Sequence, residues 1–150
     1  MKNKSLDQLT KISKKIADKL SKNDCIFLIG EIGVGKTTLA RVIINYLQKK
    51  NSLKITEVLS PTFNILYEYN LKNLKIMHYD LYRLHNSKDL NKLGIFSKED
   101  ESIKIIEWPK IIKTSIKNKL EIHMKYSKNE NERNIKLLGN GKWENFLNEL

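Results

Sequence analysis

A glycine-rich segment at residues 30–38 has the residue types and spacing of a phosphate-binding loop. It reads GEIGVGKTT and fits the pattern G-x-x-x-x-G-K-[ST]. The glycines allow successive backbone N–H groups to face phosphate oxygens, and the positive end of the following helix adds to the anion site. In this pattern Lys36 neutralises the β- and γ-phosphates, and the Thr37 hydroxyl binds Mg²⁺. We therefore expect ATP and Mg²⁺ as cofactors, with the nucleotide held by Glu31, Gly33, Val34, Gly35, Lys36, Thr37 and Thr38.

Two acidic residues stand where such a protein needs a carboxylate for the hydrated Mg²⁺. Asp80 follows the segment at residues 74–79, and Glu107 follows the apolar segment at residues 103–106. Both are expected at the carboxyl ends of strands, where ligands bind in α/β sheets. Spacing alone leaves open which of the two holds the metal ion and which orients water.

The loop SPTF at residues 60–63 adds a hydroxyl to the candidate site. Pro61 stiffens the turn and keeps Ser60 away from helical angles. Thr62 could then reach the γ-phosphate or the metal ion; the alternative is an ordinary loop with a capping hydroxyl. Together with Lys36, the two carboxylates and Thr62 form the set of candidate catalytic residues.

Histidine and cysteine give no competing site. His78 lies inside a strand segment, where a lone histidine is more often structural than catalytic. The sequence has no Cys and His residues at zinc-binding spacing, and no Ser/His/Asp set can be argued.

The elements that must hold these residues follow from hydrophobic periodicity. Ser5 and Gln8 match a capping box at the start of an amphipathic helix. A strand, a glycine loop and a helix in that order are typical of α/β architecture. We expect a P-loop NTPase fold with a mostly parallel central sheet, flanking helices and a C-terminal antiparallel hairpin. The expected helices cover residues 5–21, 36–49 and 87–93, with a last helix around Trp143, and the expected strands cover residues 25–29, 54–59, 63–69, 75–80, 102–106, 120–126 and 133–138.

Length and composition narrow the class of protein. A chain of 150 residues suffices for one domain, here residues 1–150. The sequence shows no signal peptide and no membrane-spanning run, and its single cysteine excludes an internal disulfide, so we expect a cytoplasmic protein. The net charge of +11 favours contact with nucleic acid, but a composition rich in Lys, Asn and Ile also follows from AT-rich coding.

Four segments together resemble the TsaE family, also called YjeE, in matching order and spacing. They are GEIGVGKTT at residues 30–38, SPTF at 60–63, HYDLYR at 78–83 and IEWP at 106–109. A weaker match continues through residues 93–95 and Arg133, so the resemblance covers nearly the whole chain. Phe63 replaces a tyrosine common in the family and Tyr79 a frequent phenylalanine, and both changes keep an aromatic ring.

The resemblance implies an ATPase required, with TsaD and TsaB, to form threonylcarbamoyladenosine at adenosine 37 of tRNAs reading ANN codons. TsaD carries the transfer chemistry, and direct contact of this chain with tRNA is left open. By this analogy Thr37 and Glu107 are Mg²⁺ ligands, and Asp80 and Thr62 act at the γ-phosphate on water or metal. Arg133 and residues 5–8 are expected to approach the nucleotide.

The positions of the arginines affect the expected rate of ATP hydrolysis and the choice between alternative functions. Arg41 and Arg83 are not clearly placed as arginine fingers, so ATP hydrolysis is expected to be slow alone and stimulated by partners. One alternative is a small P-loop kinase acting on a metabolite, although no arginines cluster in a lid-like loop. Another is a binding module for which ATP serves only as a switch.

Overall fold

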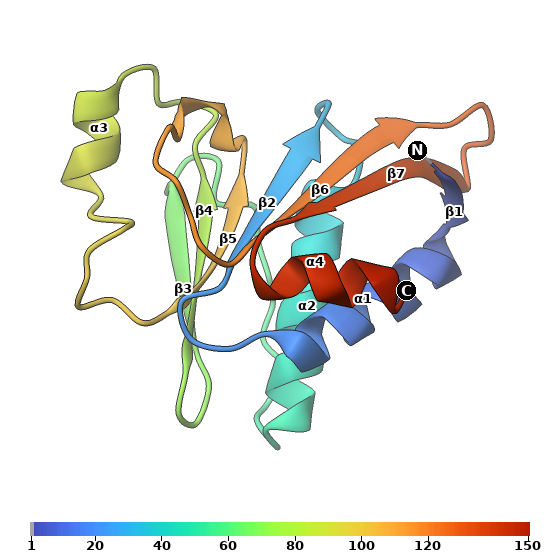
Figure 1. Cartoon of the computed structure of the whole chain (residues 1–150), viewed down its shortest axis with the longest axis horizontal. Coiled ribbons are helices and arrows are strands. Elements are labelled where there is room, and N and C mark those ends of the chain that lie inside the picture. The colour runs from blue at the N-terminus through green and yellow to red at the C-terminus, as the bar shows by residue number, and fades with distance from the viewer. Residues whose placement is uncertain (1) are drawn as a thin grey trace.

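Residues 2–150, the part of the chain that the computed structural model describes, fold around one seven-stranded sheet (Figure 1). The strands are β1 (Lys2–Ser5), β2 (Cys25–Gly30), β3 (Leu66–Asn70), β4 (Lys75–Asp80), β5 (Ile103–Glu107), β6 (Lys119–Tyr126) and β7 (Glu132–Gly139). The helices are α1 (Leu6–Lys19), α2 (Lys36–Lys50), α3 (Ser87–Lys92) and α4 (Lys142–Asn148), with a 3₁₀ turn at Pro109–Ile111.

The sheet is parallel at its centre and antiparallel at both edges. Its strand order is β1-β7-β6-β2-β5-β4-β3. The four central strands, β6, β2, β5 and β4, run parallel, which aligns their carboxyl ends at one edge of the sheet. Strand β7 pairs antiparallel with β6, as the predicted C-terminal hairpin requires. The predicted α/β fold is therefore confirmed.

Helices α1, α2 and α4 share one face of the sheet, and α3 lies on the other (Figure 1). Strand β2 is buried on both sides because its side chains alternate between two hydrophobic cores. Ile26 and Leu28 contact the core under α1 and α2, whereas Cys25 and Phe27 contact the core that includes α3. Burial raises the pKa of the Cys25 thiol to about 12, so this cysteine acts as a buried hydrophobic residue.

The helix ends agree with the sequence signals. The capping box before α1 is present, since Ser5 Oγ accepts from the Gln8 N–H and Gln8 Oε1 accepts from the Ser5 N–H. In the C-terminal helix Trp143 and Phe146 are buried against β7 and each other. Most predicted boundaries move by only one or two residues. Among the helices of residues 2–150, none has the length and apolar character needed to cross a membrane.

Three sequence-based assignments need correction. The predicted strand at residues 54–59 is wrong, because within the described chain this extended segment joins no sheet. It packs on α2 instead: the Val58 carbonyl accepts from Arg41 (3.2 Å to Nη2), and the Thr56 hydroxyl accepts from Gln48 (2.8 Å). The strand predicted from residue 63 begins at residue 66, after a turn in which the Ile65 N–H donates to the Pro61 carbonyl (2.6 Å). Strand β1 was not predicted at all.

Candidate active site

The predicted site residues meet at the carboxyl edge of the parallel strands, around a cleft of about 310 Å³. The loop after β2, the turn before β3 and the ends of β4 and β5 all contribute to it. Eight of the predicted site residues line this cleft: Gly33, Gly35, Lys36, Thr37, Thr38, Thr62, Asp80 and Glu107. Gly33 and Glu107, the first and last of these residues, are 74 positions apart in the sequence (107 − 33), and the parallel register of the strands brings them together.

The backbone of the glycine loop is shaped for close approach to a ligand. Gly33 and Gly35 have φ angles of 76° and 115°, which side-chain-bearing residues rarely adopt. A Cβ atom at Gly30 would collide with the backbone oxygen of Met124 on the neighbouring strand β6. Helix α2 begins directly after Gly35, so its free N–H groups point toward the cleft.

Lys36 is held inside the loop. Its ammonium group donates to the carbonyls of Gly30 and Glu31, both at 2.8 Å, and lies 4.2 Å from the Trp108 ring centroid. Burial lowers the pKa of Lys36, and the nearby negative charges of Glu107 and Asp80 oppose that shift. A cation in these surroundings is positioned to neutralise an incoming anion.

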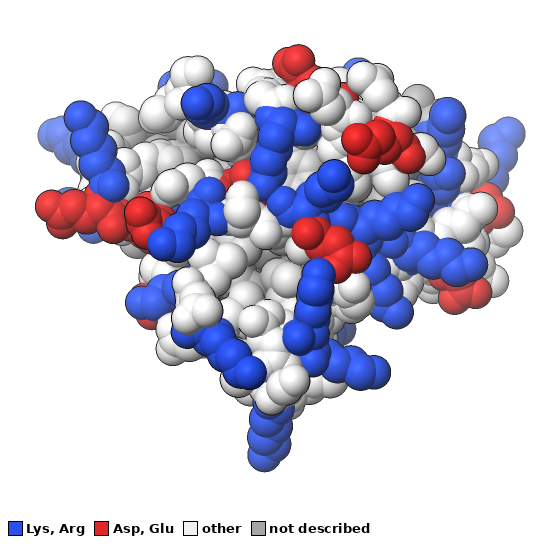
Figure 2. All heavy atoms as spheres, turned by 60° about the horizontal axis from the view of Figure 1, so that its bottom comes forward, with Lys and Arg blue, Asp and Glu red and all other residues white. Residues whose placement is uncertain are grey.

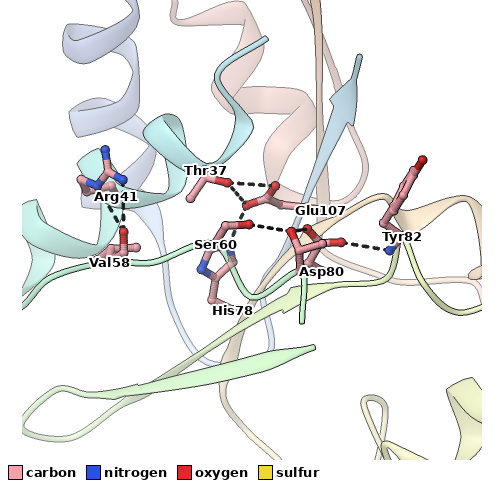
Figure 3. Close-up of polar contacts among 9 residues, drawn as sticks. Thr37, Arg41, Val58, Ser60, His78, Asp80, Tyr82 and Glu107 are labelled. Atoms are coloured by element: carbon pink, nitrogen blue, oxygen red, sulfur yellow. Dashed lines mark hydrogen bonds and ion pairs between the residues drawn. The ribbon is translucent and has the colours of Figure 1, made fainter. Parts of the chain in front are cut away.

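The Glu107 carboxylate has side-chain hydrogen-bond partners on two different elements of the site (Figure 3). It ends β5, is 2% exposed, and accepts a hydrogen bond from the Thr37 hydroxyl at 2.9 Å to Oε1. The Nε2 atom of the fully buried His78 lies 2.9 Å from the same oxygen. The carboxylate is thus fixed from two sides, with Thr37 facing the cleft. A hydroxyl and a carboxylate are oxygen ligands of the kind that Mg²⁺ prefers.

Asp80 ends β4 and faces the cleft beside Glu107, with which it is paired in register. Its Oδ2 atom accepts from the Thr62 hydroxyl (2.9 Å), and its Oδ1 atom accepts from the Tyr82 N–H (2.9 Å). Ser60 Oγ lies 2.8 Å from the Thr62 hydroxyl oxygen. The SPTF loop therefore reaches the site through Thr62, and Ser60 is a further cleft residue that the sequence analysis had not included.

Trp108 forms part of the rim of the cleft. Its φ angle of 56° is a left-handed conformation, which is strained for a residue with a large side chain. This backbone turn, followed by the 3₁₀ turn from Pro109, places the indole over Lys36 and 4.9 Å from the Tyr82 ring. Strain of this kind persists only where the surroundings fix it, and here it places an aromatic ring against the loop lysine.

The β6–β7 hairpin supports the glycine loop from outside the cleft. Arg133 Nε donates to the Val34 carbonyl (2.9 Å), and the Tyr126 hydroxyl donates to the Ile32 carbonyl (2.8 Å). These two side chains are cross-strand partners, with the guanidinium 5.2 Å from the Tyr126 ring centroid. Both contacts join loop carbonyls to side chains that do not line the cleft. Tyr126 had no signal in the sequence, because its role depends on a partner 94 residues away.

Several predicted residues lie around the cleft without lining it. Arg133 contacts the loop backbone, and Glu31 contributes its carbonyl to Lys36, while the Val34 side chain is buried in the core. Residues 5–8 form the cap of α1 and are absent from the described lining of the cleft. Their predicted contact with a nucleotide remains a prediction.

The other two arginines bind elsewhere. Arg41 donates to the Val58 carbonyl, and Arg83 lies over the Phe63 ring, 5.6 Å from its centroid. No arginine is among the described residues that line the cleft. His78, which the sequence favoured as a structural residue, is structural in position but contacts the site carboxylate directly.

Comparison with known proteins gives the same assignment as the motifs. The model of the family described as threonylcarbamoyl adenosine biosynthesis protein TsaE matches residues 3–135. A tRNA threonylcarbamoyladenosine biosynthesis protein TsaE from Rickettsia conorii is 39% identical over 109 residues, 73% of this chain and 60% of that protein. The protein of the same name from Rickettsia typhi is 37% identical over 136 residues, covering 90% of this chain and 88% of the relative.

The fold has a counterpart among solved structures. The crystal structure of YdiB from a Bacillus species superimposes with a TM-score of 0.70 at 24% identity, covering 99% of this chain and 93% of that one. The match to the Rickettsia conorii relative spans only 60% of its length. The family assignment rests on the match over residues 3–135 and on the identity to these relatives. The chain belongs to the TsaE family.

Proposed function

We propose that residues 1–150 act as one P-loop ATPase domain that works in the cytoplasm with TsaD and TsaB. The reaction it serves is the formation of threonylcarbamoyladenosine at adenosine 37 of tRNAs reading ANN codons. ATP and water become ADP and phosphate in this cleft, and the threonylcarbamoyl transfer belongs to the partner. The observation that carries the proposal is the contact between Thr37 and Glu107, which joins the end of the phosphate loop to the end of β5.

The oxygen donors at this contact fit Mg²⁺. Within residues 2–150 no three His, Cys, Asp or Glu side chains form a group that could hold a metal by themselves. A site built from one hydroxyl and one carboxylate therefore suits an ion that also takes phosphate oxygens and water as ligands. Thr37 and Glu107 would hold it, and when bound it would neutralise charge on the β- and γ-phosphates. His78 fixes the orientation of the Glu107 carboxylate through its hydrogen bond.

Asp80 and Thr62 are the residues we assign to the attacking water. The Thr62 hydroxyl donates to Asp80, and both residues line the cleft. With the Thr62 hydroxyl hydrogen on Asp80, the carboxylate and the Thr62 oxygen can both accept from one water molecule, which leaves a lone pair of that water free to face phosphorus. Lys36 and the loop N–H groups stabilise the negative charge that remains on the β-phosphate side.

The position of the arginines supports slow hydrolysis by the isolated chain. An arginine finger accelerates phosphoryl transfer by roughly 10³- to 10⁵-fold in P-loop NTPases. Arg41 contacts the Val58 carbonyl, Arg83 contacts Phe63 beside Thr62, and Arg133 contacts the glycine-loop backbone, and none of the three is among the described residues that line the cleft. We propose that a partner supplies the missing positive charge or moves a residue of this chain into place.

Phosphate release tests the proposal. The purified chain is assayed with Mg·ATP alone and after addition of TsaB and TsaD, beside Glu107→Gln, which keeps shape and removes the charge. We expect slow release that rises with the partners, and a loss of about 100-fold or more in the variant. Phosphate transfer to a metabolite in place of water would support the kinase alternative. Tight ATP binding without hydrolysis under any of these conditions would contradict the proposal.

A further inference from the structure

A second hollow of about 520 Å³ lies between α1, strands β1 and β7, and α4. Among the described residues it shares no lining residue with the nucleotide cleft, and its lining includes Lys2 and Leu150. We call it the lysine groove, because five lysines from three elements line it: Lys2, Lys4, Lys11, Lys15 and Lys136.

These five lysines are exposed or partly exposed, and they differ from the lysines that form ion pairs in the described part of the chain. Within residues 2–150, none of the five takes part in an ion pair, and no carboxylate side chain lines the groove. Seven other lysines do pair with carboxylates: Lys19, Lys22, Lys50, Lys75, Lys104, Lys119 and Lys142. Figure 2, with the lower side of Figure 1 turned forward, shows basic side chains over much of this side and fewer acidic ones. The positive charge of the groove is therefore not neutralised by the chain itself.

The walls between the lysines are aliphatic. On α1 the groove is lined by positions 8, 11, 12 and 15, which share one helical face. Ile12 contributes from this face, Leu137 from β7, and Leu147 and Leu150 from the C-terminal end. Leu150 is 45% exposed, and Ile12, Leu137 and Leu147 are partly exposed. Ile12, Leu137 and Leu147 pack in part on the core under α1 and α2, and the apolar surface that they leave exposed lies between basic side chains, which is typical of a site for another molecule.

The combination of lysine and aliphatic side chains in the groove favours one class of anionic partner over another. Single-stranded RNA binds on aromatic rings with which its bases stack, and none of the described groove residues is aromatic. An amphipathic helix offers aliphatic side chains to a groove and acidic ones to its rim, which matches both features here. We propose that the lysine groove binds an acidic amphipathic segment of a partner protein, with carboxylates paired to the lysines and aliphatic residues against Ile12, Leu137 and Leu147.

The proposal is tested with a defined probe on the chain of residues 1–150. The probe is a fluorescently labelled peptide of about five helical turns, with leucine at positions i, i+3, i+4 and i+7 and glutamate elsewhere. Lys11→Glu combined with Lys15→Glu reverses two groove charges. Lys14→Glu combined with Lys49→Glu is the matched control, because these two exposed lysines lie outside the groove and change the net charge equally. Fluorescence anisotropy gives the Kd.

We expect the groove variant to weaken peptide binding by about tenfold and the control by about twofold or less. Leu150→Ser should weaken it by a few-fold, because it removes apolar contact only. Circular dichroism melting checks that each variant is folded, and Glu-to-Gln exchange throughout the peptide should abolish binding. Equal loss in the groove and control variants would overturn the proposal, as would no binding to the wild-type chain. So would an RNA oligonucleotide of similar length that binds more tightly than the peptide and depends on Lys11 and Lys15.

Discussion

The two ends of the parallel strands both bury charged side chains, but they do so in different ways. At the carboxyl end, Lys36, Asp80 and Glu107 are each at most 6% exposed and line an open cleft. At the amino end, Asp24 and Lys104 are as deeply buried, at 0% and 5% exposure. Burial of charge by itself therefore does not distinguish the candidate active site from the rest of the protein.

The charges at the amino end are matched by the chain itself and join its elements. Asp24 Oδ2 accepts from the Ser21 N–H (2.7 Å) and pairs with the ammonium group of Lys142, which ties α4 to the turn before β2. Lys104 on β5 lies 3.5 Å from Asp100 and 3.4 Å from the Ser102 carbonyl oxygen. A buried ion pair of this kind is costly to break, because the remaining charge is left without its partner.

The charges at the carboxyl end are arranged for a ligand. The partners of Glu107 and Asp80 are hydroxyl groups, an imidazole and a backbone N–H, and the ammonium of Lys36 donates to backbone carbonyls. No lysine or arginine forms a direct ion pair with Asp80 or Glu107 within residues 2–150. A buried charged side chain therefore indicates a functional site when it faces a cleft and has no ion-pair partner of opposite charge within the described chain.

The largest expected effect tests the carboxyl end. Lys36→Ala should lower ATP hydrolysis by about 100- to 1,000-fold, because it removes the cation that stabilises the phosphates. It should leave the free energy of unfolding unchanged or raise it, since burial already disfavours the charged lysine, as its lowered pKa indicates. Steady-state kinetics and urea unfolding measure the two quantities. Normal ATP hydrolysis by this variant would contradict a role in catalysis and would mean that the buried charges at both ends of the sheet are structural.

Asp24→Ala tests the amino end and should have the opposite pattern. The free energy of unfolding should fall by about 2 kcal/mol, less than for a fully buried pair because the Lys142 side chain is 33% exposed. The Kd for ATP should not change, because Asp24 is at the other end of β2 from the glycine loop. Urea unfolding and isothermal titration calorimetry provide the measurements. Weaker ATP binding in a folded variant would show that the two ends are coupled.

Tyr126→Phe sharpens the comparison on the carboxyl side. It removes one hydroxyl and keeps the ring, so the Ile32 carbonyl loses a hydrogen bond worth about 1 kcal/mol. We expect the Kd for ATP to rise about fivefold with little change in kcat, since the loop is held less firmly while the reacting groups are intact. Tyr67→Phe on the edge strand β3 is a control, because this tyrosine does not line the nucleotide cleft. A fall in kcat at unchanged affinity would argue against a role in shaping the loop.

The smallest effect is expected at an exposed charge between α1 and α2. A hydrogen bond from Lys50, with a second from Tyr46, holds the pKa of Asp18 below its ordinary value of 3.8. A lowered pKa means that the folded state favours the ionised form, so this stabilisation exists above the unfolded pKa and is lost as pH falls through the folded pKa. Solvent screening makes it small. Urea unfolding at about pH 7 and about pH 3 measures how far the free energy of unfolding falls in acid. This fall should be slightly smaller for Asp18→Asn than for the wild type, and a larger fall in the variant would contradict the prediction.

Much of the fold could be predicted because the signals are local. The capping box of α1, the buried run of β2 and the glycine loop each lie within one stretch of sequence. The segment at residues 54–59 misled the prediction, because its apolar residues suit a strand equally well, and contact with Arg41 and Gln48 decided otherwise. Strand β1 was not predicted because its four residues show no alternation of apolar and polar side chains, and they form a strand only through pairing with β7.

The sequence by itself predicted the candidate site: a glycine-rich loop with Lys36 and Thr37 in the pattern of a phosphate loop, and carboxylates at the ends of two apolar segments. It also determined the family, because the four motifs keep their order and spacing. Only the tertiary structure decided that Glu107 meets Thr37 and His78, that Asp80 meets Thr62, and that five unpaired lysines from three elements share one groove. The physical reason is that periodicity and capping report on the backbone within a few residues, whereas strand order and helix packing place side chains that are many residues apart.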